Sequence, residues 1–207
     1  MKTIFVDTCV WRHWFSHLDQ PSKLTPKLKA ESEAFQRIYN LVLNSDSKQF
    51  VFNQRIVDEL GSQFAEHLEE KVLPFAKKVP IPLTRPDGAY KPDGSLICGG
   101  NCGGTLRDLL VIQGYKHADK LEEAATSLAP DAYLYNTKPR KKEFDIEHME
   151  SALECNAELF ITADERTILN LLKQAAKSYP IQHPITHMHS IAKLPSESLN
   201  ILTCSNH

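Results

Sequence analysis

The chain has 207 residues, of which 42% are apolar and 24% charged, and its formal net charge is −2. This composition is typical of a globular protein, and the length allows one domain with a sizeable insertion. The near-neutral charge excludes a partner held mainly by a bulk positive field, such as long duplex nucleic acid. A local basic patch can still bind a polyanion.

The sequence carries no signal for a membrane or a secretory route. No run approaches the roughly 20 apolar residues that span a bilayer, and Asp7 interrupts the first apolar stretch too early for a signal peptide. The cysteines are odd in number and scattered, which argues against a disulfide framework and favours a reducing compartment. We therefore predict a cytoplasmic protein.

The first part of the chain alternates strands and helices. Residues 2–7 are predicted to form a strand, because Ile4, Phe5 and Val6 make a short apolar run. Trp11, Trp14, Phe15 and Leu18 then follow at helical spacing, a stripe expected to pack in the core rather than to stack on bases. Helix is predicted for 28–43, strand for 49–52, and helix again for 55–78, where Pro74 would kink or split it. Such alternation predicts a mainly parallel sheet covered on both faces.

The middle of the chain breaks this pattern. Residues 79–104 are rich in proline and glycine, which predicts a long extended insertion, and helical texture returns at 106–114 and 118–128. Cys98 and Cys102 lie at a spacing found in zinc sites, but no second ligand pair follows them. A plain loop is favoured over structural zinc.

The last part of the chain combines a basic run with an amphipathic segment. Lys138, Arg140, Lys141 and Lys142 are predicted to lie in a surface loop, where they either face solvent or contact backbone phosphates. A helix with Asp145 in its first turn is expected next, then a buried strand at 158–162 and a helix at 166–177. Edge strands are predicted at 185–189 and 200–203.

Four acids stand where these elements begin or end: Asp7, Glu59, Asp145 and Asp164. In a parallel sheet they would meet at the carboxyl edge, where open α/β sheets bind ligands. Crowded carboxylates repel unless a cation neutralises them, and oxygen ligands suit Mg²⁺ or Mn²⁺. Such a site would polarise a phosphodiester and activate water. The alternative is that each acid only caps a helix.

The chain resembles PIN-domain ribonucleases, the family that includes VapC-type toxins of toxin–antitoxin pairs. The resemblance is carried by IFVDT at 4–8, VDEL at 57–60 and DIEHMESALECNAELFITAD at 145–164. It implies one three-layer α/β/α domain over residues 1–207, with a mainly parallel central sheet. It also implies a Mg²⁺- or Mn²⁺-dependent endoribonuclease whose metal ligands are the four acids named above.

The same resemblance suggests roles for polar neighbours and for partners. Thr8 and Thr162 would assist near the scissile phosphate or the metal-bound water, and His148, one turn after Asp145, would face the site as a supporting residue. RNA is the expected substrate. A cognate antitoxin would be a further partner, and a symmetric homodimer is the default for a soluble protein.

Two other functions stay open at this stage. A phosphatase of the haloacid-dehalogenase type also begins with an acid after its first strand, but it needs a second aspartate two residues later, where Cys9 stands. A non-catalytic nuclease-like domain that binds a partner would use its acids only as helix caps. RNA cleavage that depends on a divalent metal distinguishes the ribonuclease from the phosphatase and from the non-catalytic domain.

Overall fold

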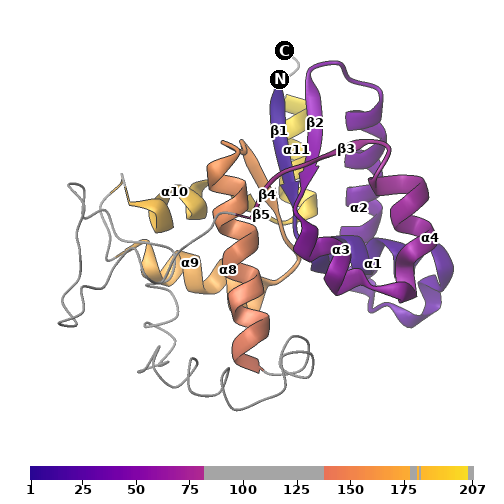
Figure 1. The fold of residues 1–207 in the computed structure, drawn as a ribbon, viewed down its shortest axis with the longest axis horizontal. Helices are drawn as coiled ribbons and strands as arrows, with labels where there is room; N and C mark the ends of the chain where they lie inside the picture. The colour runs from indigo at the N-terminus through magenta and orange to yellow at the C-terminus, as the bar shows by residue number, and fades with distance from the viewer. Residues whose placement is uncertain (82–137, 178–180, 182, 205–207) are drawn as a thin grey trace.

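A computed structural model of the chain describes residues 1–81, 138–177, 181 and 183–204, and only the backbone of residues 138–143. It has an α/β fold whose five-stranded, all-parallel sheet has the order β3-β2-β1-β4-β5 and is flanked by helices (Figure 1). The strands are β1 (Lys2–Val6), β2 (Lys48–Phe52), β3 (Ala76–Lys78), β4 (Leu159–Ile161) and β5 (Ala192–Lys193). The predicted α/β fold with a parallel central sheet is confirmed.

Helices cover both faces of this sheet, as the burial of parallel strands requires. Among them α1 packs on α2, α2 packs on α11, and α10 packs on α9, α8 and β4. In Figure 1, α2 and α8 lie on opposite sides of the strands. Their bounds are α1 (Thr8–Asp19), α2 (Pro26–Leu43), α3 (Gln54–Leu60), α4 (Ala65–His67), α8 (Lys138–Glu154), α9 (Asn170–Ala175), α10 (Pro184–Ile191) and α11 (Pro195–Cys204).

Strand β1 lies at the centre of the sheet and pairs with a neighbour on each side. Phe5 is opposite Val51 of β2 and Phe160 of β4. The last three residues of β1 are fully buried, because helices cover both of its faces. An unbroken apolar run without alternation is the sequence pattern of such a strand, which is why β1, β2 and β4 were predictable.

The aromatic stripe of α1 is a main part of the core. Trp11 and Trp14 are buried, and the Trp11 ring makes edge contacts with Phe35 of α2 at 5.0 Å and with Phe50 of β2 at 5.7 Å between centroids. The core role predicted for this stripe is confirmed for these residues. Leu18, which continues the same spacing, is 40% exposed.

The helix predicted for residues 55–78, kinked or split at Pro74, is wrong, because it breaks at Gly61 and residues 76–78 form a strand. Helix α3 ends at Leu60 because Gly61 follows with a φ of 55°, a backbone conformation that favours glycine and breaks the helix. A 3₁₀ turn (Ser62–Phe64), α4 and a π-helical segment (Leu68–Val72) come next. Pro74 lies in the turn before β3, which pairs with β2 at the edge of the sheet.

The predicted bounds of the late helix also need correction. Helix α8 begins at Lys138, so the basic run predicted as a loop forms its first turns, and Asp145 lies about two turns inside it rather than in its first turn. The helix ends where Asn156 adopts a φ of 52°, a left-handed conformation that asparagine tolerates. The chain then enters β4.

The two edge strands predicted in the tail are wrong as well. Residues 185–189 belong to α10 and residues 200–203 to α11, with β5 between the two helices. Both helices begin with a proline, Pro184 and Pro195, at the position where its missing N–H is not needed. The Nδ1 atom of His183 further caps α10 by accepting the Ile185 N–H at 3.2 Å.

The expected insertion is described only as far as Ile81. The helical segments expected at 106–114 and 118–128, and the pair Cys98 and Cys102, lie outside the described residues. Within the part of the chain that is described, no helix is long and apolar enough to cross a membrane.

The aromatic core yields a first prediction. Trp11→Ala should lower the free energy of unfolding by about 3–5 kcal/mol, because it leaves a cavity between α1, α2 and β2. Leu18→Ala, on the exposed end of the same helix, should change it by no more than about 0.5 kcal/mol. Urea unfolding of both variants measures the difference, and equal losses would contradict the packing described here.

Candidate active site

Asp7 directly follows β1 and lies beside the carboxyl end of β4. The Asp7 N–H donates to the Ile161 carbonyl at 2.9 Å, so the β1–β4 ladder continues into this residue. The carboxylate is buried, and its Oδ2 accepts hydrogen bonds from the Thr162 hydroxyl at 2.8 Å and the Cys9 thiol at 2.9 Å. Asp7 occupies the N-cap position of α1, yet its side chain makes no capping bond. Helix capping therefore does not account for this acid.

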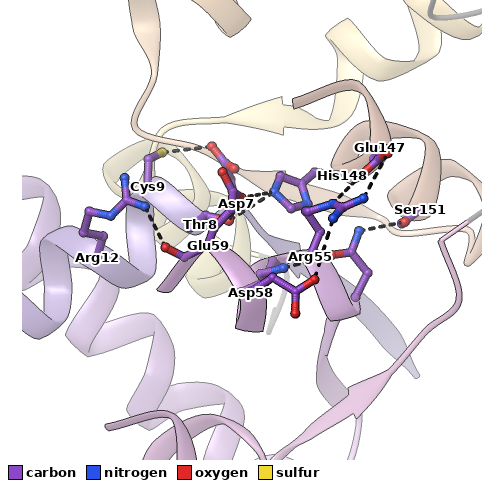
Figure 2. A network of polar contacts seen from close by, with 12 residues as sticks. Asp7, Thr8, Cys9, Arg12, Arg55, Asp58, Glu59, Glu147, His148 and Ser151 are labelled. Carbon is purple, nitrogen blue, oxygen red and sulfur yellow. Dashed lines mark hydrogen bonds and ion pairs between the residues drawn. The ribbon is translucent and has the colours of Figure 1, made fainter. Parts of the chain in front are cut away.

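Glu59, near the end of α3, reaches the same region from the other side of β1. Its Oε2 lies 2.6 Å from the Thr8 hydroxyl and 2.7 Å from His148 Nε2, and these last two atoms are 3.0 Å apart (Figure 2). Three residues from separate stretches of the sequence are thus brought together. The Thr8 hydroxyl, instead of capping α1, binds Glu59.

The neighbours of Glu59 favour its charged form. Burial alone would raise the pKa of this carboxyl, but the hydrogen bond and charge of His148, the Thr8 hydroxyl and the charge of Arg12 outweigh it. The pKa of Glu59 therefore lies below its ordinary value. Arg12 is exposed, and its guanidinium donates to the Glu59 main-chain carbonyl at 3.3 Å.

Cys9 and His13 lie beside the acids in uncharged form. Burial and the charge of Asp7 raise the pKa of the Cys9 thiol well above its ordinary value, so the thiol keeps its proton and donates a hydrogen bond to Asp7. Burial and the charge of Arg12 lower the pKa of His13, although Asp7 and Asp164 oppose them.

Two polar links join α3 to α8 on either side of His148. Arg55 donates to both carboxylate oxygens of Glu147, at 2.7 and 3.3 Å, and its guanidinium lies 4.3 Å from the centre of the Phe144 ring. The buried Asn53 amide donates to the Ser151 hydroxyl at 2.9 Å. These links fix the height and rotation of the two helices relative to each other.

The same arrangement separates Glu59 from its neighbour Asp58. The Asp58 carboxylate accepts a hydrogen bond from Gln54 at 3.0 Å and pairs with Arg55 at 3.7 Å, so its partners lie on α3 itself. Glu59 is thus the acid of this pair that reaches β1.

Asp164 is held by local contacts. Its Oδ1 accepts the Thr167 N–H at 2.8 Å, and its Oδ2 accepts the Thr167 hydroxyl, so this carboxylate caps the π-helical segment Glu165–Leu169. The Thr162 hydroxyl, which donates to Asp7, accepts the Asp164 N–H at 3.1 Å. Thr162 therefore connects the two acids, and the capping alternative describes the contacts of Asp164.

Asp145 lies three residues before His148 on α8, so helical spacing places the two on one face of the helix. It is partly buried and has interactions of its own. The side chains of Lys138, Arg140, Lys141 and Lys142 lie outside the described residues. Their predicted phosphate contacts stay a prediction.

The acids do not form a closed metal cage in this structure. No group of three or more His, Cys, Asp and Glu side chains in the described residues comes together to hold a cation. Asp7 and Glu59 each use one oxygen in hydrogen bonds, whereas Oδ1 of Asp7 and Oε1 of Glu59 bind no described residue. Mg²⁺ is commonly held by one or two carboxylates, with water and substrate phosphate completing its shell. The residues therefore fit an open two-carboxylate site.

Arg12 is a site residue that the sequence-based prediction missed. It lies four residues after Thr8 on α1, and this spacing puts both on one helix face. The periodicity could have identified Arg12. The pairs Arg55–Glu147 and Asn53–Ser151 had no comparable signal, because each joins residues more than 90 positions apart.

Comparison of the chain with protein-family models, with curated proteins and with solved structures found no match.

The lowered pKa of Glu59 predicts how stability depends on pH. A carboxyl whose native pKa is depressed contributes stability above the ordinary glutamate pKa of about 4.3, and loses it as the pH falls through the native value. Glu59→Gln should therefore lose less stability on acidification from about pH 7 to about pH 3 than the unaltered protein.

Urea unfolding across this pH range measures the effect. Glu70→Gln, which removes an exposed glutamate of the π-helical segment Leu68–Val72, is the matched control. Its stability should fall on acidification as much as that of the unaltered protein. An equal loss of unfolding free energy at low pH in all three proteins would contradict the stabilising contacts of Glu59.

Proposed function

We propose that the protein is an endoribonuclease that depends on Mg²⁺ or Mn²⁺. The observation that carries the proposal is the pair Asp7 and Glu59 at the carboxyl edge of the sheet. Hydroxyl, thiol and imidazole groups orient each carboxylate through one oxygen, and the other oxygen has no described protein partner. Such preorganised carboxylates suit a hard cation that is shared with a phosphate.

Mg²⁺ or Mn²⁺ bound there would polarise the phosphodiester and lower the pKa of a bound water. The protein's own contribution is orientation. Thr162 and Cys9 hold Asp7, and Thr8 and His148 hold Glu59. The surrounding side chains are mostly buried, so solvent screens these charges only weakly.

RNA is the substrate that best agrees with the surroundings of this site. Arg12 places an exposed cation beside Glu59, where it can contact a backbone phosphate. The resemblance of residues 4–8, 57–60 and 145–164 to PIN-domain ribonucleases supports the same assignment. A cognate antitoxin and a homodimer belong to this proposal as partners.

The two alternatives have less support. In a phosphatase of the haloacid-dehalogenase type the second residue after Asp7 would be an acid, and here it is Cys9, a thiol that donates to Asp7. A non-catalytic domain agrees with the capping role of Asp164. It gives no reason for two oriented carboxylates, Asp7 and Glu59, that cap no helix.

The experiment is cleavage of RNA by the purified protein with Mg²⁺ or Mn²⁺ and with EDTA. EDTA should abolish cleavage. Asp7→Asn should reduce the rate about 100-fold or more, by analogy with the loss of one group that stabilises a transition state. Asp46→Asn, an exposed acid in the loop before β2, should leave the rate unchanged.

Cleavage that persists in EDTA, or that Asp7→Asn leaves unchanged, would refute the proposal. Hydrolysis of a phosphomonoester without cleavage of RNA would favour the phosphatase. Binding of a protein partner without any hydrolysis would favour the non-catalytic domain.

The contact proposed for Arg12 predicts a change in the salt dependence of binding. If Arg12 neutralises one phosphate, Arg12→Gln should reduce the slope of log K against log salt for single-stranded RNA by about 0.7. Arg37→Gln, an exposed arginine on α2, should leave the slope unchanged. Fluorescence anisotropy of a labelled RNA in EDTA measures both, and equal slopes for the two variants would remove Arg12 from the RNA-binding surface.

A further inference from the structure

His148 is buried in the middle of the proposed site. It lies on α8 with 1% of its side chain exposed, and its ring centre is 6.0 Å from that of Phe5 on β1. Its Nε2 contacts Thr8 and Glu59, as Figure 2 shows. The other ring nitrogen, Nδ1, is buried and has no hydrogen-bond partner in the described residues.

The hydrogens in this cluster can be assigned from its chemistry. A carboxylate has no hydrogen to donate, so Oε2 of Glu59 accepts from both the Thr8 hydroxyl and the imidazole. His148 must therefore carry a hydrogen on Nε2. Among the described residues Nδ1 has no partner, so within this part of the chain Nε2 is the only ring atom of His148 that makes a polar contact.

The unpaired Nδ1 argues against a purely structural role. Burying a polar atom without a partner costs free energy, and an apolar side chain of similar size would pack against Phe5 without this cost. Such unsatisfied groups in folded proteins call for a functional explanation. The contact of Nε2 with Glu59 gives a functional reason for a histidine at this position.

We propose that His148 is a positioning residue for Glu59. By donating its Nε2–H to Oε2, together with the Thr8 hydroxyl, it fixes the rotation of the carboxylate and leaves Oε1 for the cation of the proposed nuclease. The inference rests on the proposed function. Outer partners that orient a metal ligand in this way contribute strongly to metal affinity.

Two links besides His148 hold α8 in position. Glu147 and Ser151, on the same helix, hold α8 to α3 through Arg55 and Asn53. The helix should therefore stay in place when His148 is replaced. This makes it possible to test orientation separately from folding.

Two substitutions of His148 separate its hydrogen bond from its packing. His148→Gln can place an amide N–H where Nε2 lies, whereas His148→Leu fills a similar volume without a donor. Mn²⁺ binding, followed by the electron paramagnetic resonance signal of the free ion, does not require activity. His148→Leu should raise the Kd for Mn²⁺ about tenfold or more, and His148→Gln should bind close to the unaltered protein.

Thermal unfolding and kinetics complete the test. The melting temperature of either variant should shift by no more than about 4 °C. In RNA cleavage at saturating Mn²⁺, His148→Leu should lower kcat and leave KM for RNA unchanged, because Arg12 is untouched. Thr8→Val, which removes the second donor to Glu59 at nearly constant volume, provides an independent variant and should also weaken Mn²⁺ binding.

The outcomes distinguish this inference from the function on which it rests. An unaltered protein that binds no Mn²⁺ would overturn the proposed metal site. Normal binding by the unaltered protein and by His148→Leu would overturn the positioning role alone. Equal losses in His148→Leu and His148→Gln would also overturn it, because they would trace the effect to the ring and not to its donor.

Discussion

The central position of β1 is the constraint on which the rest of the structure depends. Because this strand pairs with β2 on one side and β4 on the other, residues from both halves of the sheet meet at its carboxyl end. Asp7 and Thr8 stand directly at that end. Glu59 lies on α3, which follows β2, and Thr162 directly follows β4. The order of the strands therefore decides which residues meet at the site.

The buried carboxylate of Asp7 and the partly buried carboxylate of Glu59 each accept two hydrogen bonds. An isolated buried carboxylate would take up a proton, since burial disfavours charge. At Asp7 a hydroxyl and a protonated thiol provide the hydrogen bonds, and at Glu59 a hydroxyl and an imidazole do. Asp164 differs from Asp7 and Glu59, because both of its oxygens accept hydrogen bonds from Thr167. It is therefore less available than those two acids to bind a cation.

The sequence predicted the parts of the fold that have a strong local signal. The apolar runs of β1, β2 and β4 were found, whereas β3 and β5 were not, because an edge strand such as Ala76–Lys78 is specified by the strand beside it. In the site, the structure brings together Thr8, Glu59 and His148, whereas their roles stay predictions. The start of α8 and the clamp of Arg55 on Glu147 were missed, since they depend on contacts between distant residues.

The pairing of β1 with β4 also orders events during synthesis. These two strands are separated by more than 150 residues, and contacts of such long range form late, after most of the chain exists. A ribosome-bound chain that ends before β4 has Asp7 without its Thr162 partner. If the chain ends before α8, Glu59 also lacks His148. The proposed site would therefore stay incomplete until α8 and β4 have left the ribosome.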